Sequence, residues 1–161
     1  MFIEAETEND QFAIRRVTIA AFEQPDEADL VDALRSSCDA IISLIAKTDD
    51  GEIIGHILFS KFQSPDQCLA LAPVSVHPDH QNTGVGTKLV TEGLARAKQE
   101  GWLAVFVLGE PDYYGRFGFS AALADKFDAP FPKPYFMALE LLPGILDKKS
   151  GIVIYAEPFQ I

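Results

Sequence analysis

The spacing of apolar side chains along the chain predicts four helices. The clearest is residues 85–99, where apolar side chains recur every three or four positions and a glycine at position 101 follows as a natural stop. Two further helices are separated by Pro25, and Pro111 opens a short helical segment. The predicted helices are residues 8–22, 28–37, 85–99 and 111–114.

Alternating and continuous apolar runs predict about seven strands. Residues 102–108 are almost wholly apolar, as expected of a strand that is buried on both faces. The turn residues Asp49-Asp50-Gly51 join two neighbouring runs into a β-hairpin. The predicted strands are residues 2–5, 41–47, 52–62, 68–76, 102–108, 135–142 and 151–156.

The order of these elements mixes hairpins with one strand–turn–helix unit. We therefore predict an α/β fold with a mixed, mostly antiparallel sheet. The length of 161 residues is within the usual size of one domain, and the chain contains no internal repeat or low-complexity tract. Residues 1–161 are predicted to form a single domain.

The charge balance limits the partners of the protein. The chain has 13 Lys and Arg against 24 Asp and Glu, a net charge of −11, and no basic stripe offsets it. Such a field repels phosphate backbones, so nucleic-acid binding is not expected. Residues 1–32 hold nine carboxylates and two arginines. Such a region is usually a solvated face, and the alternative is that Glu23, Asp26 and Glu27 attract a cationic partner.

Cysteine usage and the N-terminus point to a reduced, cytoplasmic protein. Cys38 and Cys68 have no paired spacing, and the first residues lack a basic region followed by an apolar one. No apolar run approaches the ~20 residues of a membrane span. His77 and His80 flank a proline turn without a further cluster of ligands, so we expect no metal.

A glycine turn follows the predicted strand 68–76 and precedes the predicted helix 85–99. Its sequence is Gln81-Asn82-Thr83-Gly84-Val85-Gly86. In a strand–turn–helix arrangement the free backbone N–H groups and the positive helix end converge on an anion. Glycines at positions 84 and 86 let a diphosphate approach the amides closely. We therefore predict a phosphate-binding turn.

Two other phosphate motifs fit this turn less well. A P-loop requires Gly-x-x-x-x-Gly-Lys-Ser/Thr, whereas Lys88 follows Thr87 here rather than the second glycine of such a frame. A dinucleotide fold requires a third glycine where Leu89 stands, together with an alternating parallel βαβ series. Neither pattern is present.

The pattern Gln81-x-x-Gly84-x-Gly86 after such a strand resembles the coenzyme A signature of the GNAT family of N-acetyltransferases. Downstream, the segment 114–119 resembles the family's second motif, a Tyr four residues before Gly-Phe. Residues 108–114 look like those of a bacterial branch of the family, without the Asn and Ala that many members place before the Tyr. The resemblance implies the GNAT fold, about seven strands flanked by about four helices, with acetyl-CoA as the acyl donor.

The resemblance also assigns the cofactor-binding residues. Backbone groups of Val74 and Val76 pair with the pantetheine arm as though it were an added strand, and the Val76 N–H is a candidate to polarise the thioester carbonyl. The amides of the glycine turn take the pyrophosphate. The expected cofactor-binding residues are Val74, Val76, Gln81, Asn82, Thr83, Gly84, Val85, Gly86 and Thr87.

Catalytic roles follow from the same resemblance. Tyr114 stands where the family has its general acid, and motif register favours it over Tyr113. Glu110 and Asp112 lie near the expected centre and are candidates for the base, although solvated loop carboxylates are the commoner interpretation. Water relayed by backbone carbonyls is the alternative to a side-chain base.

The leading hypothesis is acetyl transfer from acetyl-CoA to a primary amine of a small molecule or a peptide. The acidic N-terminal region offers a cationic acceptor as the weaker alternative to a solvated face. The alternative is a non-catalytic sensor that binds acyl-CoA. A third, weaker option is transfer to an oxygen or from a longer acyl donor. A homodimer is kept as an open prediction.

Overall fold

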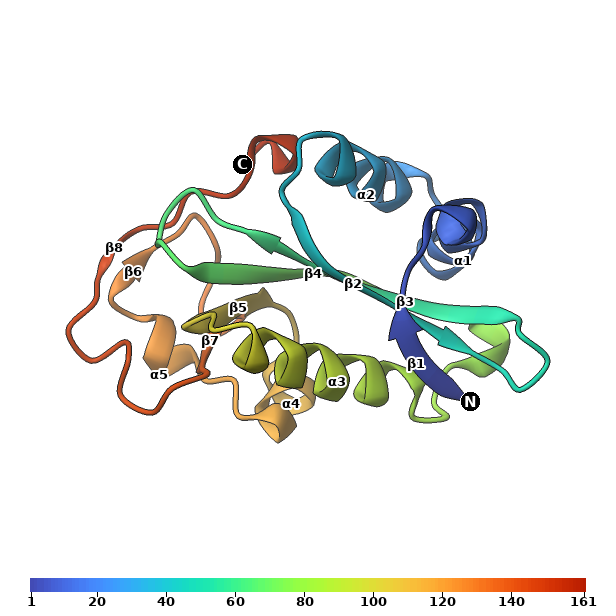
Figure 1. The fold of residues 1–161 in the computed structure, drawn as a ribbon. Coiled ribbons are helices and arrows are strands. Elements are labelled where there is room, and N and C mark those ends of the chain that lie inside the picture. The colour runs from blue at the N-terminus through green and yellow to red at the C-terminus, as the bar shows by residue number, and fades with distance from the viewer.

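The computed structural model describes all 161 residues. Figure 1 shows a central sheet with α1 and α2 on one face and α3 on the other. The helices are α1 (Gln11–Phe22), α2 (Asp26–Ser36), α3 (Val85–Gln99), α4 (Pro111–Tyr114) and α5 (Ala121–Ala124). The strands are β1 (Phe2–Ala5), β2 (Ala40–Lys47), β3 (Ile53–Lys61), β4 (Cys68–Val76), β5 (Ala104–Leu108), β6 (Phe127–Asp128), β7 (Phe136–Glu140) and β8 (Gly151–Ile152).

The main sheet has six strands in the order β1-β2-β3-β4-β5-β7. All neighbours are antiparallel except β4 and β5, which run parallel. These two strands pair only over residues 68–70 and 104–106, although β4 continues to Val76 and β5 to Leu108. One edge of β4 beyond Ala70 therefore has no strand partner, and this opening positions the site described below.

Helix α3 covers one face of the sheet because its buried side chains join the largest apolar cluster of the protein. Val85, Leu89 and Val90 pack there with Phe59 of β3 and other strand residues. Gly93 allows the close approach, since a Cβ at that position would lie 2.2 Å from the ring of Phe59. The amphipathic pattern thus fixes both the helix and the face that it buries.

Helices α1 and α2 cover the opposite face. Val31 and Leu34 of α2 pack against Leu58 of β3 in a separate buried cluster, and Ile14 and Val17 of α1 are buried as well. Contacts of α1 reach both β3 and β4. The C-terminal end of α1 is thereby held beside the open edge of β4. None of the five helices combines the length and the apolar character needed to cross a lipid bilayer.

The structure confirms the α/β fold with a mixed, mostly antiparallel sheet, with six strands in that sheet rather than about seven. The prediction for residues 151–156 was wrong in extent and placement: only β8 forms there, and it pairs in parallel with β6 in a small second sheet. The outer edge of β7 cannot accept it at Ala138, because the backbone N–H and C=O of this residue bond to Ser120. The elements α5 and β6 were not predicted.

Candidate active site

The turn between β4 and α3 is held by its own side chains. A one-turn 3-10 helix (Pro78–His80) follows β4, and the backbone then takes left-handed conformations at Asn82, with φ of 62°, and Gly84, with φ of 88°. The Thr83 hydroxyl donates to the carbonyl of His80. Asparagine and glycine tolerate these conformations best, which explains the residue types at both positions.

The N-terminus of α3 supplies a cluster of free backbone donors. Gly84 is the N-cap, and the first intrahelical bond runs from the Lys88 N–H to the Gly84 carbonyl at 3.1 Å. The N–H groups before Lys88 therefore have no partner within the helix. They point along the axis of a 15-residue helix whose positive end favours an anion.

The open edge of β4 presents the backbone groups of Val74 and Val76. The His77 N–H donates to the Ile54 carbonyl of β3 at 2.8 Å. Because backbone groups alternate sides along a strand, those of Val74 and Val76 point away from β3 and toward the open edge. The Gln81 side-chain amide donates to the Val76 carbonyl at 3.1 Å, in agreement with this orientation. The remaining groups are free to pair with an extended ligand.

A cavity of about 610 Å³ connects these two features, which is within the usual range for a cofactor site. Its floor consists of Val74 and Val76, and one wall consists of the glycine turn and the start of α3. Ala21 and Phe22, at the end of α1, form another wall. The sequence-predicted cofactor residues that line the cavity are Val74, Val76, Gln81, Asn82, Gly84, Val85, Gly86 and Thr87. Thr83 lies in the turn without lining it.

The two tyrosines of α4 take different positions. Tyr113 lines the cavity, and its hydroxyl would lie 3.1 Å from a Cβ placed on Gly86. The Arg116 guanidinium stacks over the Tyr113 ring at 4.5 Å and lines the cavity too. Tyr114 lies behind this wall, packed against Gly109 and the apolar cluster under α3. Burial raises the pKa of the Tyr114 phenol to about 12, and neighbouring Tyr113 adds to the shift.

The comparisons with known proteins agree with this geometry. The model of the acetyltransferase (GNAT) family matches residues 9–119. The N-acetyltransferase YhbS of Escherichia coli K12 is 33% identical over 164 residues, which cover 99% of this chain and 98% of YhbS. The N-acetyltransferase YjhQ of the same organism is 38% identical over 135 residues, 78% of this chain and 74% of YjhQ.

The chain belongs to the GNAT family. Its structure superposes on that of Escherichia coli YhbS in complex with CoA with a TM-score of 0.92, at 32% identity and over 99% of this chain and 92% of that one. A GNAT acetyltransferase of Brucella melitensis in complex with acetyl-CoA gives a TM-score of 0.83, at 36% identity and over 98% and 97% of the two chains. This protein is an acetyl-CoA-dependent N-acetyltransferase with the GNAT fold.

Glu110 lies at the start of α4 and does not line the cavity of this GNAT enzyme. Its carbonyl accepts the N–H groups of Tyr113 and Tyr114, so its backbone begins the helix while its side chain is exposed. No three His, Cys, Asp or Glu side chains lie close enough together to share a metal ion. The structure therefore gives Glu110 a capping position and brings no other carboxylate to the cavity wall.

Five residues that line the cavity of the GNAT site were not among the predicted cofactor-binding residues: Ala21, Phe22, His80, Tyr113 and Arg116. Tyr113 and Arg116 stand three positions apart, the spacing of one helical face, which could have identified them as a pair. Ala21 and Phe22 reach the cavity only because α1 crosses the sheet next to β4, a tertiary relation that local sequence does not encode. His80 also lines the cavity, although its sequence context suggested only a proline turn without metal ligands.

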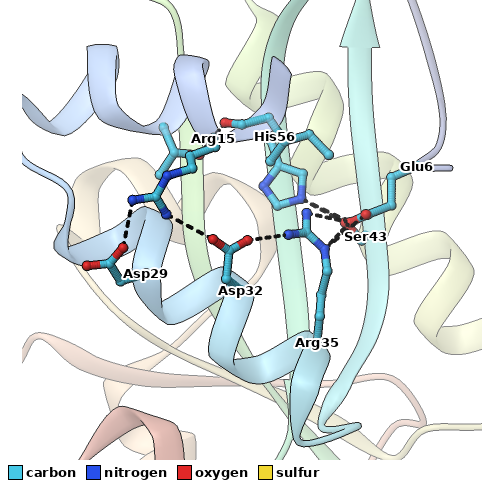
Figure 2. Close-up of polar contacts among 9 residues, drawn as sticks. Glu6, Arg15, Asp29, Asp32, Arg35, Ser43 and His56 are labelled. Atoms are coloured by element: carbon cyan, nitrogen blue, oxygen red, sulfur yellow. Dashed lines mark hydrogen bonds and ion pairs between the residues drawn. The ribbon is translucent and has the colours of Figure 1, made fainter. Parts of the chain in front are cut away.

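A polar cluster lies under α1 and α2, on the face of the sheet opposite α3 (Figure 2). Arg35 of α2 donates to Glu6 and Asp32, at 3.0 and 2.9 Å, and Ser43 of β2 donates to Glu6. His56 of β3 is fully buried, with its Nε2 2.7 Å from the Ser43 hydroxyl oxygen. Arg15 of α1 extends the cluster through Asp29 and Asp32, at 2.8 and 2.9 Å.

The charges of this cluster are strongly perturbed. Burial alone raises the pKa of Glu6, but its contacts with His56, Ser43 and Arg35 outweigh burial and lower the pKa to about 2. Burial lowers the pKa of His56, against the opposing effect of Glu6, and the positive charge of Arg35 lowers it further. At neutral pH Glu6 is therefore ionised and the His56 imidazole is neutral.

Proposed function

We propose that this enzyme transfers the acetyl group of acetyl-CoA to the primary amine of a small molecule or a peptide that carries positive charge. One observation carries the proposal: a single cavity joins the free edge of β4 and the N-terminus of α3 to the end of α1. The proposed donor-binding groups thus share a cavity with Phe22, directly before the acidic residues Glu23, Asp26 and Glu27 at the turn into α2.

The donor half of the cavity suits acetyl-CoA. The free amides at the start of α3 would bind the pyrophosphate, with the helix dipole adding to the attraction. Arg116 is the arginine that lines this cavity, so its guanidinium could contact the phosphates of the cofactor. The pantetheine arm would pair with Val74 and Val76, and the Val76 N–H would polarise the thioester carbonyl.

Transfer requires a neutral amine and a proton for the leaving thiolate. The amine nitrogen attacks the thioester carbonyl carbon, the C–N bond forms and the C–S bond breaks. We assign the proton for the thiolate to the Tyr114 phenol, whose pKa of about 12 keeps it protonated at neutral pH. The phenolate regains a proton from the nitrogen as the amide forms. Tyr113, which lines the cavity, is the competing donor.

Two measurements test the proposed function. A CoA concentration of ~100 times its Kd should stabilise the folded protein by about 2.7 kcal/mol. Release of free thiol from acetyl-CoA should then be screened over primary amines that include alkylamines, polyamines, amino acids and peptides. Turnover restricted to alcohols, or no turnover with any amine despite CoA binding, would contradict the proposal.

The cationic character of the acceptor has its own test. The triple variant Glu23→Gln, Asp26→Asn, Glu27→Gln should raise KM for a polyamine about 3- to 10-fold and leave KM for acetyl-CoA unchanged, because the field at the acceptor end weakens. The matched control neutralises Asp125, Asp128 and Asp147, which changes the net charge equally. These residues belong to the segments around α5 and β6 and between β7 and β8, at the end of the molecule away from α1 (Figure 1). Equal effects of both triple variants would show that net charge alone acts.

We also propose that residues 1–161 are one acetyltransferase domain and that the enzyme works in the reducing cytoplasm. Its two cysteines are free, one exposed and one buried, which is compatible with a reducing compartment. The homodimer stays a prediction, and light scattering on the eluted protein tests it.

A further inference from the structure

Three buried side-chain polar atoms of the protein have no hydrogen-bond partner: His56 Nδ1, Ser60 Oγ and Ser75 Oγ. Such atoms are rare because each costs about 1–3 kcal/mol. Two of the three are neighbours, since His56 of β3 and Ser75 of β4 stand directly opposite each other across an antiparallel pair. Side chains of opposed residues lie on the same face. Both unpartnered atoms therefore occupy the face under α1.

Whether the other ring nitrogen of His56, Nε2, carries hydrogen is determined by its neighbours. The Ser43 hydroxyl uses its only hydrogen in a hydrogen bond to the Glu6 carboxylate. Its oxygen must therefore accept a hydrogen bond from the Nε2–H of His56, with 2.7 Å between the nitrogen and the oxygen (Figure 2). This arrangement selects the tautomer with hydrogen on Nε2. His56 Nδ1 is then a bare acceptor, and Ser75 opposite it has a hydroxyl proton to donate. One water molecule is enough to connect two such groups.

The Glu6 carboxylate that faces the imidazole favours protonation of the ring, whereas burial and the charge of Arg35 oppose it. Glu6, at the end of β1, is the anion next to it, and Arg35 of α2 is the cation. The charge of Arg35 is shared with Asp32, and Arg15 of α1 is paired with Asp29 and Asp32.

From the remaining elements, Thr18 of α1 is buried but donates its hydroxyl to the Ile14 carbonyl within its own helix. Ser43 of β2 and Ser75 of β4 are the polar side chains next to the ring. A neutral imidazole beside an ionised carboxylate can accept a proton and share the resulting charge with Glu6.

The cluster lies directly behind the donor strand. Ser75 is the residue between Val74 and Val76, which form the floor of the cavity, and it is 1% exposed beneath α1. The last residues of α1, Ala21 and Phe22, line the same cavity. On the covered face of the sheet, polar side chains thus extend from Ser75, on the strand that would hold the thioester, to Glu6, which lines an open cavity with Arg35 and Cys38.

We propose that Ser75, His56, Ser43 and Glu6 form a proton relay that deprotonates the ammonium group of the acceptor. The inference rests on the proposed transfer to an amine and supplies the base that no carboxylate of the cavity wall provides. In this relay a bridging water would take one proton from the acceptor ammonium and pass it, together with Ser75, to His56 Nδ1. The imidazolium then loses a proton through Ser43 and Glu6 to solvent. The overall reaction therefore releases one proton for each acetyl group transferred.

The test compares two acceptors of one shape that differ in protonation. Phenethylamine is an ammonium ion at pH 7, whereas O-benzylhydroxylamine has the same number of heavy atoms and a neutral nitrogen. The enzyme variants are Ser75→Ala and His56→Gln. The matched control is Ser60→Ala, because Ser60 is equally buried and unpartnered on the same face but is opposite Ala40 and Ala70, away from His56.

The relay predicts that kcat/KM for phenethylamine falls about 10- to 100-fold in Ser75→Ala and His56→Gln at pH 7. The loss should shrink as pH rises, and it should be less than about threefold for O-benzylhydroxylamine, which has no proton to give up before attack. Ser60→Ala should behave like the wild type with both acceptors. The CoA affinity of every variant should stay unchanged.

Equal losses of both Ser75→Ala and His56→Gln with the two acceptors would overturn the relay and leave these residues a structural role. Wild-type behaviour of Ser75→Ala with phenethylamine would also overturn it. If the wild type binds CoA but acetylates neither probe nor any other amine, the proposed function itself fails. A third readout separates these cases: ¹⁵N NMR of the free enzyme should show the His56 tautomer with hydrogen on Nε2, and hydrogen on Nδ1 would refute the relay.

Discussion

Gly84 and Gly86 bracket the start of α3, and their replacement by alanine should have opposite consequences. Gly84 has φ of 88°, and a Cβ there would meet no atom within 4 Å. Alanine at this position therefore suffers backbone strain of about 1–2 kcal/mol but meets no other part of the protein. Gly86 lies inside the helix, and its Cβ would lie 3.1 Å from the Tyr113 hydroxyl and 3.7 Å from Val76. Alanine there narrows the cavity at the free amides.

The expected magnitudes follow from these two positions. Gly84→Ala should lower the free energy of unfolding by about 1–2 kcal/mol, roughly 2–8 °C in Tm, and change the Kd for CoA less than about fivefold. Gly86→Ala should leave stability nearly unchanged, because alanine favours the helix while the contact with Tyr113 opposes it. Holding the pyrophosphate off one amide removes a charge-assisted hydrogen bond worth about 1.5–3 kcal/mol, or about 10- to 150-fold in Kd.

Isothermal titration with CoA and thermal unfolding without ligand measure the two quantities separately. The reasoning fails if Gly86→Ala binds CoA as tightly as the wild type, because the free amides at the start of α3 would then not hold the pyrophosphate. It fails equally if Gly84→Ala weakens CoA binding more than Gly86→Ala does, because the cofactor would then approach the turn more closely at Gly84 than at the first turn of α3.

Four further variants test the site and the polar cluster. Tyr114→Phe should lower kcat at least about tenfold with an unchanged Kd for CoA, and the reverse ranking with Tyr113→Phe would transfer the acid role to Tyr113. Arg116→Gln should weaken CoA binding about 3- to 10-fold at low salt and less at high salt, measured by titration at two ionic strengths. The pKa of Glu6 in the folded protein is about 2, below its ordinary 4.5, so ionised Glu6 contributes about 3 kcal/mol to the free energy of unfolding. This contribution is complete above pH 4.5 and is lost as pH falls toward 2. Urea unfolding of Glu6→Gln should lack this acid-dependent loss.

The elements predicted best are those whose ends carry strong local signals. Helix α3 begins and ends where the pattern placed it, because the glycine turn precedes it and Gly101 follows. Strand β4 was also predicted with its observed bounds, since its apolar run ends in front of Pro78. Both elements flank the cofactor turn, so the donor half of the candidate site could be predicted from the sequence.

The elements predicted worst depend on partners far along the chain. The strands β6 and β8 are two residues each and exist only because they pair with each other. The polar cluster is similar: Glu6, Arg35, Ser43 and His56 come from separate elements, and no spacing in the sequence links them. The position of Tyr113 in front of Tyr114 depends on how α4 packs beside α3, which motif register does not report.

The net charge of −11 raises the question of how the enzyme holds an anionic cofactor. We propose that local groups at the cofactor site offset the net negative charge there. Under the proposed function, the attraction at the donor end would come from backbone amides at α3 and from Arg116, which line the same cavity. Under α1 and α2, the carboxylates of Glu6, Asp29 and Asp32 are paired with two arginines. The acidic residues after Phe22 have no cation in an ion pair, like many carboxylates elsewhere on the surface. Under the proposed function these residues lie at the acceptor end, where they would attract a cationic amine.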